Sequence, residues 1–266
     1  MGTVAESARQ TLVMLAADRM TWVLGGANVL CALLAFVLGA SASDRFDGRR
    51  LYCLLAWWLF GTLLMPWGTL YVAVQAVHGP LEDRTFQYLF LRPVRRSALL
   101  LGKWLGVTVA AAPTAAVAVA LLFAAVACRP RLWPDGIDAG LVCTFVPVMA
   151  FGAVAYAAVG VLFGAAVRRP LIWSSAFVIG LQTLTANLDV SAGLRRLTII
   201  DPLRRLLFDG IEPEPRLAQL LWPAEPDVRL EHVGSPYLDL TILIAVCLAS
   251  AAFAWSRIEY DSRGSE

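Results

Sequence analysis

The side chains most suited to chemistry in this chain are its only lysine, Lys103, and its two histidines, His78 and His232. A nucleotide-binding P-loop needs Gly-x-x-x-x-Gly-Lys followed by Ser or Thr. Here Trp104 follows the lysine, and Ser97 stands where the first glycine is required. Two distant histidines cannot form a His-Glu-x-x-His zinc helix, and no serine lies in a Gly-x-Ser-x-Gly turn. We therefore expect no catalytic, cofactor-binding or metal-binding residues, and no enzyme activity in this chain by itself.

The segment 78–105 is a charged stretch between two long apolar runs. It opens on Glu82 and Asp83, and acidic residues in a first turn are stabilised by the positive end of a helix dipole. Phe86, Leu89 and Phe90 follow at positions i, i+3 and i+4, which form one face of a helix. This pattern predicts a short amphipathic helix over residues 81–92 that lies flat on a membrane surface.

The amphipathic helix is expected to end before Pro93, because a proline pushes the preceding residue out of the α region. Basic residues flank the next apolar run and are predicted to lie at the membrane interface: Arg92, Arg95, Arg96 and Lys103. A plain basic loop at the interface, which any polytopic protein can have, would give the same composition.

The order of residues in 78–105 resembles the cytoplasmic loop between the second and third spans of ABC type-2 permeases, the membrane subunits of a class of ABC transporters. The matching residues are Glu82, Thr85, Leu89, Pro93, Arg95 or Arg96, Gly102 and Lys103. One departure is Arg84, where the family often has glycine. The resemblance implies a coupling helix that docks into a groove of a separate ATPase through Glu82, Asp83, Thr85, Phe86, Leu89, Phe90 and Pro93.

The composition is that of an integral membrane protein. Of 266 residues, 59% are hydrophobic and 16% are charged, against about 25% charged in soluble domains. Apolar runs of about 20 residues recur, which is the length that crosses a hydrocarbon core of about 30 Å. We expect a single all-α permease domain, 1–266, with six transmembrane helices at about 22–40, 51–77, 98–127, 141–167, 171–188 and 237–255. The coupling loop is then 78–97, and the external loop is 189–236.

Within the predicted spans, a proline predicts a bend and two glycines predict a close contact between helices. Pro66 is expected to kink the second span. Gly160 and Gly164 have the small-xxx-small spacing that lets helices approach closely, either within the chain or in a dimer. No ionisable residue lies well inside a span, which argues against a proton-coupled transporter and for energy supplied by a partner.

Two segments outside the spans are predicted to be helical. Thr3 and Glu6 have capping-box spacing, so a helix is expected from there to about Arg19, either as a separate surface helix or as an extension of the first span. In the loop 189–236, leucines alternate with arginine pairs, Asp201-Pro202 is a helix start and Gly210 a stop. One or two short amphipathic helices near the membrane surface are expected there; a solvated loop is the alternative.

Orientation and partners depend on the resemblance. Arginines and lysines divide evenly between the two sides, so the cytoplasmic position of the coupling loop places both termini inside, in a bacterial inner membrane. The implied partners are two ATPase subunits that bind ATP and Mg²⁺, a second permease copy or paralogue, and membrane lipids. The basic residues lie between spans rather than on one face, which gives no reason to expect nucleic acid.

The predicted function is that of a permease subunit, in an exporter, which couples ATP hydrolysis by a partner to movement of an unidentified substrate. A membrane subunit that only transmits motion or assists assembly is an alternative, and a secondary transporter is disfavoured by the missing intramembrane charges. Five cysteines without metal spacing are expected to be packing residues. No cleavable signal peptide is expected in the charged first twenty residues.

Overall fold

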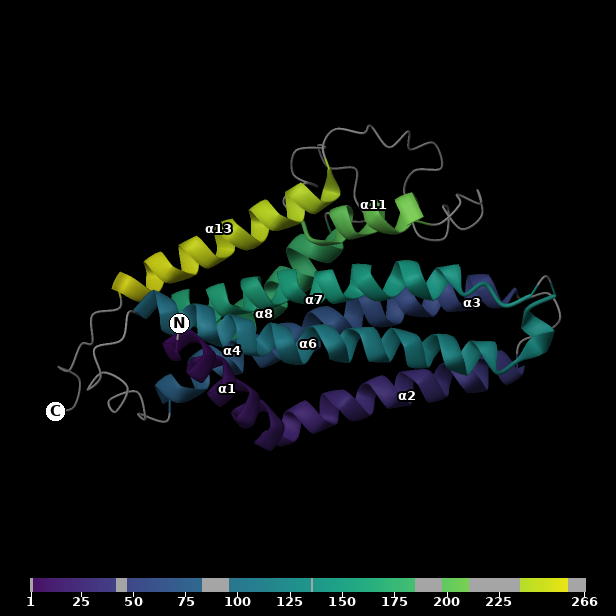
Figure 1. The fold of residues 1–266 in the computed structure, drawn as a ribbon, viewed down its shortest axis with the longest axis horizontal. Helices are drawn as coiled ribbons and strands as arrows, with labels where there is room; N and C mark the ends of the chain where they lie inside the picture. Colours follow the sequence, from purple (N-terminus) through teal and green to yellow (C-terminus); the bar gives the residue numbers. More distant parts are fainter. Residues whose placement is uncertain are drawn as a thin grey trace.

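The computed structural model describes residues 2–41, 47–82, 96–134, 136–184, 198–210 and 235–257. Every regular element in these ranges is helical, and the longer helices run along one elongated bundle (Figure 1). The first half holds α1 (Gly2–Ala17), α2 (Arg19–Ser41), α3 (Gly48–Leu54), the π-helix η1 (Leu55–Leu64), α4 (Met65–Glu82) and α6 (Arg96–Ala127). The second half holds the 3-10 helix η2 (Pro130–Leu132), α7 (Gly140–Ala166), α8 (Pro170–Ala176), the π-helix η3 (Phe177–Leu184), α11 (Ile200–Gly210) and α13 (Pro236–Arg257).

Five of the described helical segments are long and apolar enough to cross a membrane. They are Arg19–Ala40, Gly48–Gly79, Ser97–Ala127, Gly140–Ala166 and Pro236–Ser256. Their bounds agree with five of the six predicted spans to within three residues. The all-helical, multi-span class predicted from hydropathy is therefore confirmed.

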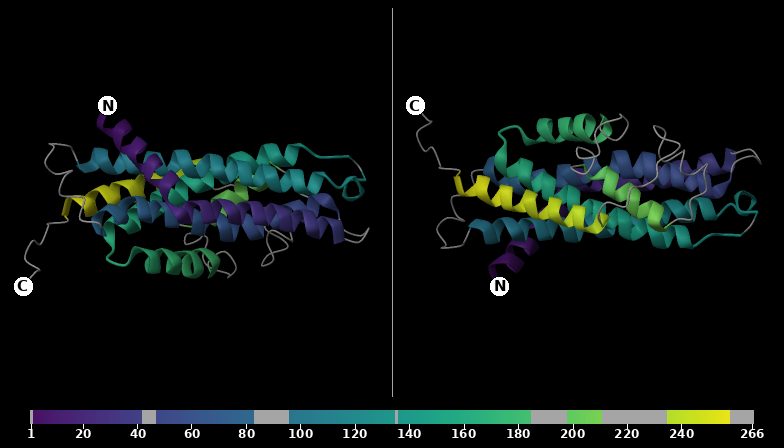
Figure 2. Two further views of the ribbon diagram at one scale, coloured as in Figure 1. Left: turned by 90° about the horizontal axis from the view of Figure 1, so that it is seen from below. Right: turned by 90° about the horizontal axis from the view of Figure 1, so that it is seen from above.

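The predicted span 171–188 differs from the other five. Its described part is α8 and η3, of seven and eight residues, and its last predicted residues, 185–188, lie outside the described ranges. Figure 2 shows this helix to one side of the main bundle. The structure thus provides five candidate spans among its described residues rather than six.

Helix α1 starts and helix α13 finishes at the same end of the bundle (Figure 1). Between α7 and α13, the described helices α8 and α11 contact opposite ends of α7. Helix α8 starts beside the end of α7, whereas Gly210, at the end of α11, contacts Thr144 near the start of α7. Helix α13 then crosses in the direction of α7, with the Tyr237 ring 6.1 Å from that of Phe151.

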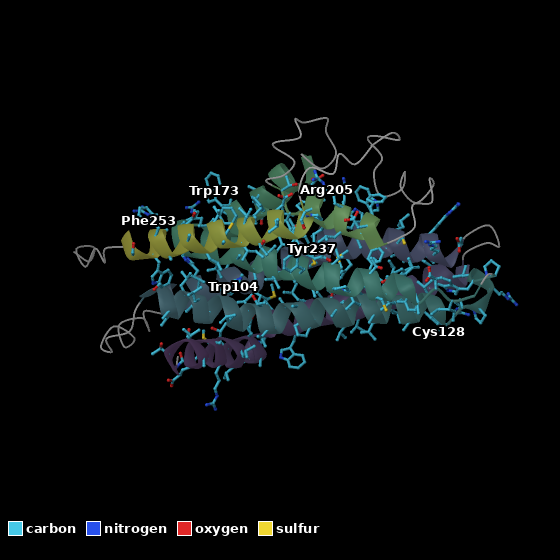
Figure 3. All side chains as sticks on the ribbon, turned by 45° about the horizontal axis from the view of Figure 1, so that its top comes forward. Trp104, Cys128, Trp173, Arg205, Tyr237 and Phe253 are labelled. Carbon is cyan, nitrogen blue, oxygen red and sulfur yellow. The ribbon has the colours of Figure 1, made fainter. Side chains whose placement is uncertain are left out.

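Helix α7 is the centre of the bundle, packed against α4, α6, α11 and α13. In an apolar stretch of 18 residues in the α7 span 67% of the residues are buried, whereas in the corresponding stretch of α2 only 17% are. Tyr52 is fully buried between the rings of Phe123 and Phe145, both in edge contact with it. Trp173 and Phe253 are more than half exposed on the outside of the bundle (Figure 3). This distribution fits spans whose outer surfaces face lipid.

Helix α1 is separate from the first span, which decides between the two possibilities that the sequence left open. The break falls at Asp18, whose carboxylate accepts hydrogen bonds from the backbone N–H of Met20 (3.3 Å) and the hydroxyl of Thr21 (3.3 Å). Asp18 thereby caps the start of α2, as expected of aspartate at a helix N-terminus. Helix α1 packs across the beginning of α6.

The second span is irregular next to Pro66, where a kink was predicted. The ten residues Leu55–Leu64 are π-helical and lead directly into α4, and the N–H of Met65 bonds to the carbonyl of Phe60, five residues back. Local π geometry is a recognised way to accommodate a break in the regular helical hydrogen bonding. Helices α3, η1 and α4 thus form one continuous helical segment.

Candidate functional site

Most of the predicted coupling helix, 81–92, and the two predicted site residues just after it lie outside the described residues. The predicted site residues concerned are Asp83, Thr85, Phe86, Leu89, Phe90, Arg92, Pro93 and Arg95. The two helices that hold this segment are described. Helix α4 ends at Glu82, and α6 begins at Arg96. Glu82 is the last residue of α4, which continues five residues beyond the predicted end of the second span, through Gly79 and Pro80.

Lys103 links α4 and α6 just inside this end of the bundle. Its side chain is 7% exposed, and Nζ donates a hydrogen bond to the carbonyl oxygen of Ala76. Pro80, four residues after Ala76, has no N–H to donate to that carbonyl. A buried carbonyl needs a hydrogen-bond donor, and Lys103 supplies one. Lys103, predicted to lie at the membrane interface, is thus buried where α4 and α6 meet.

Helix α1 is fixed to the first turns of α6 by two glycines. A Cβ on Gly102 would lie 2.6 Å from the Ser7 Cβ, and one on Gly106 would lie 2.8 Å from the Ala8 carbonyl oxygen. The Ser7 hydroxyl also donates to the carbonyl of Leu99 (3.0 Å). Helices α1, α4 and α6 are therefore closely joined near the end of α4 and the start of α6, the two helix ends that flank residues 83–95.

Gly160 and Gly164 lie against α4 within the same chain. A Cβ on Gly160 would lie 2.5 Å from the Ala73 Cβ, and one on Gly164 would lie 3.0 Å from the Val77 Cβ. The spacing allows close packing within the chain or in a dimer, and the described residues show packing within the chain, between α4 and α7. The same α4 turns carry the Ala76 carbonyl that accepts from Lys103.

Gly160→Ala is expected to lower the free energy of unfolding by about 1–3 kcal/mol, because overpacking a tight contact forces backbone shifts. The matched control is Gly26→Ala in α2, where nothing lies within 4 Å of the added Cβ. The control should stay within about 0.5 kcal/mol of the wild type. Unfolding of the detergent-solubilised chain by denaturant measures both variants. Equal stability of the two would contradict the close contact.

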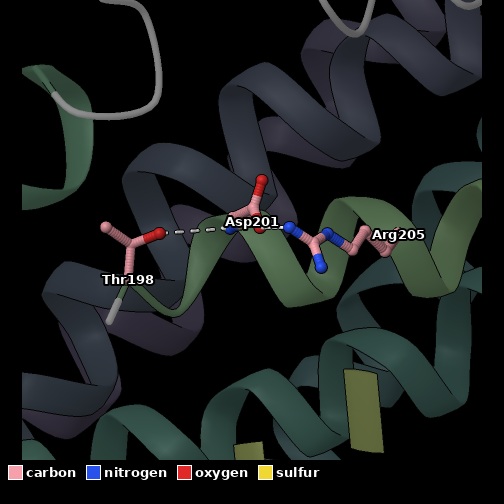
Figure 4. A network of polar contacts seen from close by, with 3 residues as sticks. All are labelled: Thr198, Asp201 and Arg205. Carbon is pink, nitrogen blue, oxygen red and sulfur yellow. Dashed lines mark hydrogen bonds and ion pairs between the residues drawn. The ribbon is translucent and has the colours of Figure 1, made fainter. Parts of the chain in front are cut away.

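A group of charged side chains lies inside the bundle on α11. Asp201 and Arg204 are 5% and 3% exposed. The Asp201 carboxylate forms an ion pair with Arg205 (2.6 Å). The backbone N–H of Asp201 donates a hydrogen bond to the Thr198 hydroxyl (3.4 Å; Figure 4). The Arg204 guanidinium lies 5.4 Å from the centroid of the Trp57 ring, within the range of a cation–π contact.

Helix α11 is the amphipathic helix predicted to start at Asp201-Pro202 and to stop at Gly210, and it packs along the first half of α7. Leu203 reaches Gly152, halfway along α7, and Gly210 reaches Thr144 near its start. The apolar residues of α11 are almost fully buried against α7 and α13: Ile200, Leu203, Leu206 and Leu207. The start also differs in detail, since Thr198 rather than Asp201 provides the cap, which leaves the Asp201 carboxylate to pair with Arg205.

The sequence placed these charges on an amphipathic helix but did not indicate that they would be buried. Asp201, Arg204 and Arg205 belong to the loop 189–236, whose hydropathy is too low for a span. The signal that could have found them is the i, i+4 spacing of Asp201 and Arg205 on a strongly amphipathic helix. Charged side chains are seldom buried in a protein unless they are paired.

A cavity opens between α2, the η1–α4 helix and α6, about halfway along the last two. Most of its lining is apolar, including Leu24, Phe60, Met65 and Val72. Its polar groups are the side chains of Thr21, Asn28, Thr69 and Thr114. Such a lining can take an apolar or amphipathic molecule, held by hydroxyl and amide hydrogen bonds.

Taken together, the fold is that of a polytopic helical membrane protein with a tightly packed set of helix ends around residues 83–95. The model of the family described as ABC-2 family transporter protein matches residues 5–186. The chain belongs to this family, whose members are membrane subunits. The match extends from α1 through η3, and α11 and α13 follow it. A search of the curated proteins found no match to the chain.

Proposed function

We propose that the chain is the permease subunit of an ATP-driven ABC exporter, and that a separate ATPase supplies the energy. The observation that carries the proposal is the family match over most of the spanning region. The sequence has no P-loop, because Ser97 and Trp104 occupy positions where the motif needs glycine and serine or threonine. ATP and Mg²⁺ would therefore be bound by the partner.

Residues 81–92 are proposed as the segment that docks into the ATPase. The contacts proposed are those implied by the family resemblance, with Phe86, Leu89 and Phe90 as the apolar anchors. Support comes from the close contacts around Lys103 and Gly102, which tie α4 and α6 to each other and to α1. Because packed helices shift between discrete arrangements, closure of the ATPases would move these helices as a unit.

A second permease copy or a paralogue is proposed to complete the translocation pathway, with two ATPases bound on the cytoplasmic side. Support comes from α2, whose large apolar side chains remain exposed along most of its length, including Leu30 and Leu33. Lipid can cover such a surface as well, so the proposal is tested by crosslinking. Cysteine at Leu33 should trap a two-permease species in membranes, whereas a strictly monomeric permease in an active complex would refute it.

The substrate class proposed is apolar or amphipathic, on the strength of the cavity between α2, α4 and α6. Export and a location in a bacterial inner membrane, with both termini cytoplasmic, follow from the family resemblance. Under this orientation, the α2 residues that line the cavity lie between the membrane centre and the ATPase side, whereas the α6 residues that line it lie near the membrane centre.

The proposal is tested by ATP hydrolysis in reconstituted membranes. The purified chain in lipid should release phosphate only at background rate, because it has no P-loop. Adding the partner ATPase should give hydrolysis that depends on both proteins, together with movement of an amphipathic probe into or out of vesicles. ATP hydrolysis by the chain without an ATPase would contradict the proposal. Coupled hydrolysis without any transport would favour a subunit that only transmits motion.

A further inference from the structure

A second cavity, of about 220 Å³, lies where α4 approaches its end and α7 turns into α8. Helix α4 contributes Val74, Gln75 and His78, which lie on one face at positions i, i+1 and i+4. The turn and the start of α8 contribute residues 168–172. The two apolar spans that meet here end at Gly79 and Ala166, so the cavity lies at the level where hydrocarbon gives way to lipid headgroups.

The polar wall of this cavity consists of hydrogen-bond donors suited to an anion. Arg168 and Arg169 are exposed, and each guanidinium offers a planar set of N–H donors that matches the oxygens of a phosphate. The Gln75 amide donates to the Tyr71 hydroxyl (3.3 Å) and has a second N–H. No acidic side chain is among the described residues that line the cavity.

The rest of the surroundings is apolar and faces outward. Leu171 and Ile172 line the cavity and are 41% and 61% exposed, and the next residue, Trp173, is 57% exposed on the outside of the bundle (Figure 3). A ligand that matches both the basic wall and the exposed apolar side chains carries a phosphate and a hydrocarbon chain. Basic pockets between spanning helices are known to hold the headgroups of anionic lipids.

We propose that the cavity between α4 and the α7–α8 turn binds the phosphate headgroup of an anionic phospholipid, with the acyl chains along Leu171 and Ile172. The shared chemistry is a phosphate oxyanion held by Arg168, Arg169 and the α4 side chains. A soluble phosphate would use the same guanidinium groups but would gain nothing from the exposed apolar residues of α8. The proposal does not depend on the ATPase.

The experiment measures lipid binding to the full-length chain in detergent by native mass spectrometry. Phosphatidylglycerol and phosphatidylcholine of the same chain length are titrated separately. The wild type should bind phosphatidylglycerol about tenfold more tightly, since two guanidinium groups contact an anionic headgroup. Arg168→Gln with Arg169→Gln should abolish this preference, and His78→Leu should reduce it. Glycerol 1-phosphate, a soluble competitor, should not displace the lipid at equal concentration.

The control removes the same number of charges elsewhere. Arg9→Gln with Arg19→Gln changes two exposed arginines of α1 and α2, outside the cavity lining, and should keep the tenfold preference. The proposal is overturned if the Arg168 and Arg169 variant keeps its preference, or if the control loses as much. Displacement of the lipid by glycerol 1-phosphate would overturn the assignment to a lipid. Because the readout involves no ATPase, failure here leaves the proposed coupling function untouched.

Discussion

Phe86→Ala and Leu89→Ala are each expected to weaken the binding of the ATPase to this chain about thirtyfold. Both side chains belong to the apolar face predicted for residues 81–92. A buried apolar side chain contributes about 1.5–3 kcal/mol, and a few such anchors dominate the energy of an interface. A loss of about 2 kcal/mol corresponds to a factor of about 30, since 1.4 kcal/mol is tenfold. The dissociation constant of the solubilised complex measures the effect.

Arg95→Ala is the control for this prediction. Arg95 follows Pro93 and is predicted to contact lipid headgroups rather than the ATPase, so its removal should change the affinity by less than about threefold. Each variant must first be shown to insert and to elute as the wild type does. If the Phe86 and Leu89 variants bind normally while substitutions in another loop abolish binding, residues 81–92 are not the coupling element.

Asp201→Ala is expected to lower the free energy of unfolding by about 1.5–3 kcal/mol, the range for a hydrogen bond to a charged group. The substitution removes the carboxylate that pairs with the partly buried Arg205, while Arg204 stays buried beside Trp57. Unfolding of the solubilised chain by denaturant measures the effect.

Asp209→Ala provides the matched control, because Asp209 lies on the same helix but is exposed. Surface substitutions usually change stability by no more than about 0.5 kcal/mol. If Asp201→Ala is as mild as Asp209→Ala, then α11 does not depend on its ion pair, and the charges on it have no structural role of this kind.

Hydropathy predicted the spans well because crossing a membrane imposes a length and a composition on each helix separately. The ends of Ser97–Ala127 and Gly140–Ala166 fall within one residue of their predicted bounds. The tight turn at 168–170 was also predictable, since arginines followed by proline cannot continue a span. These features depend on local sequence alone.

What could not be predicted depends on which helices are neighbours. The burial of Lys103 requires that α6 pack beside α4 at the turn where Pro80 leaves the Ala76 carbonyl without its helical donor. The burial of α11 along α7 requires the space beside Gly152, which the Leu203 side chain fills. An amphipathic pattern is the same for a helix on a membrane surface and for one packed among spans, and only the partners distinguish them.

Site-specific photocrosslinking in native membranes shows whether residues 81–92 contact a separate ATPase. A photoreactive amino acid is placed at Leu89 in the full-length chain, and a control version carries it at Ile137. Ile137 precedes the start of α7, whereas Val77, near the end of α4, contacts Gly164 near the end of α7. We expect position 89 to crosslink to a protein that carries a P-loop, identified by mass spectrometry, and position 137 not to do so. A P-loop protein crosslinked from position 137 but not from position 89 would show that residues 81–92 are not the ATPase contact.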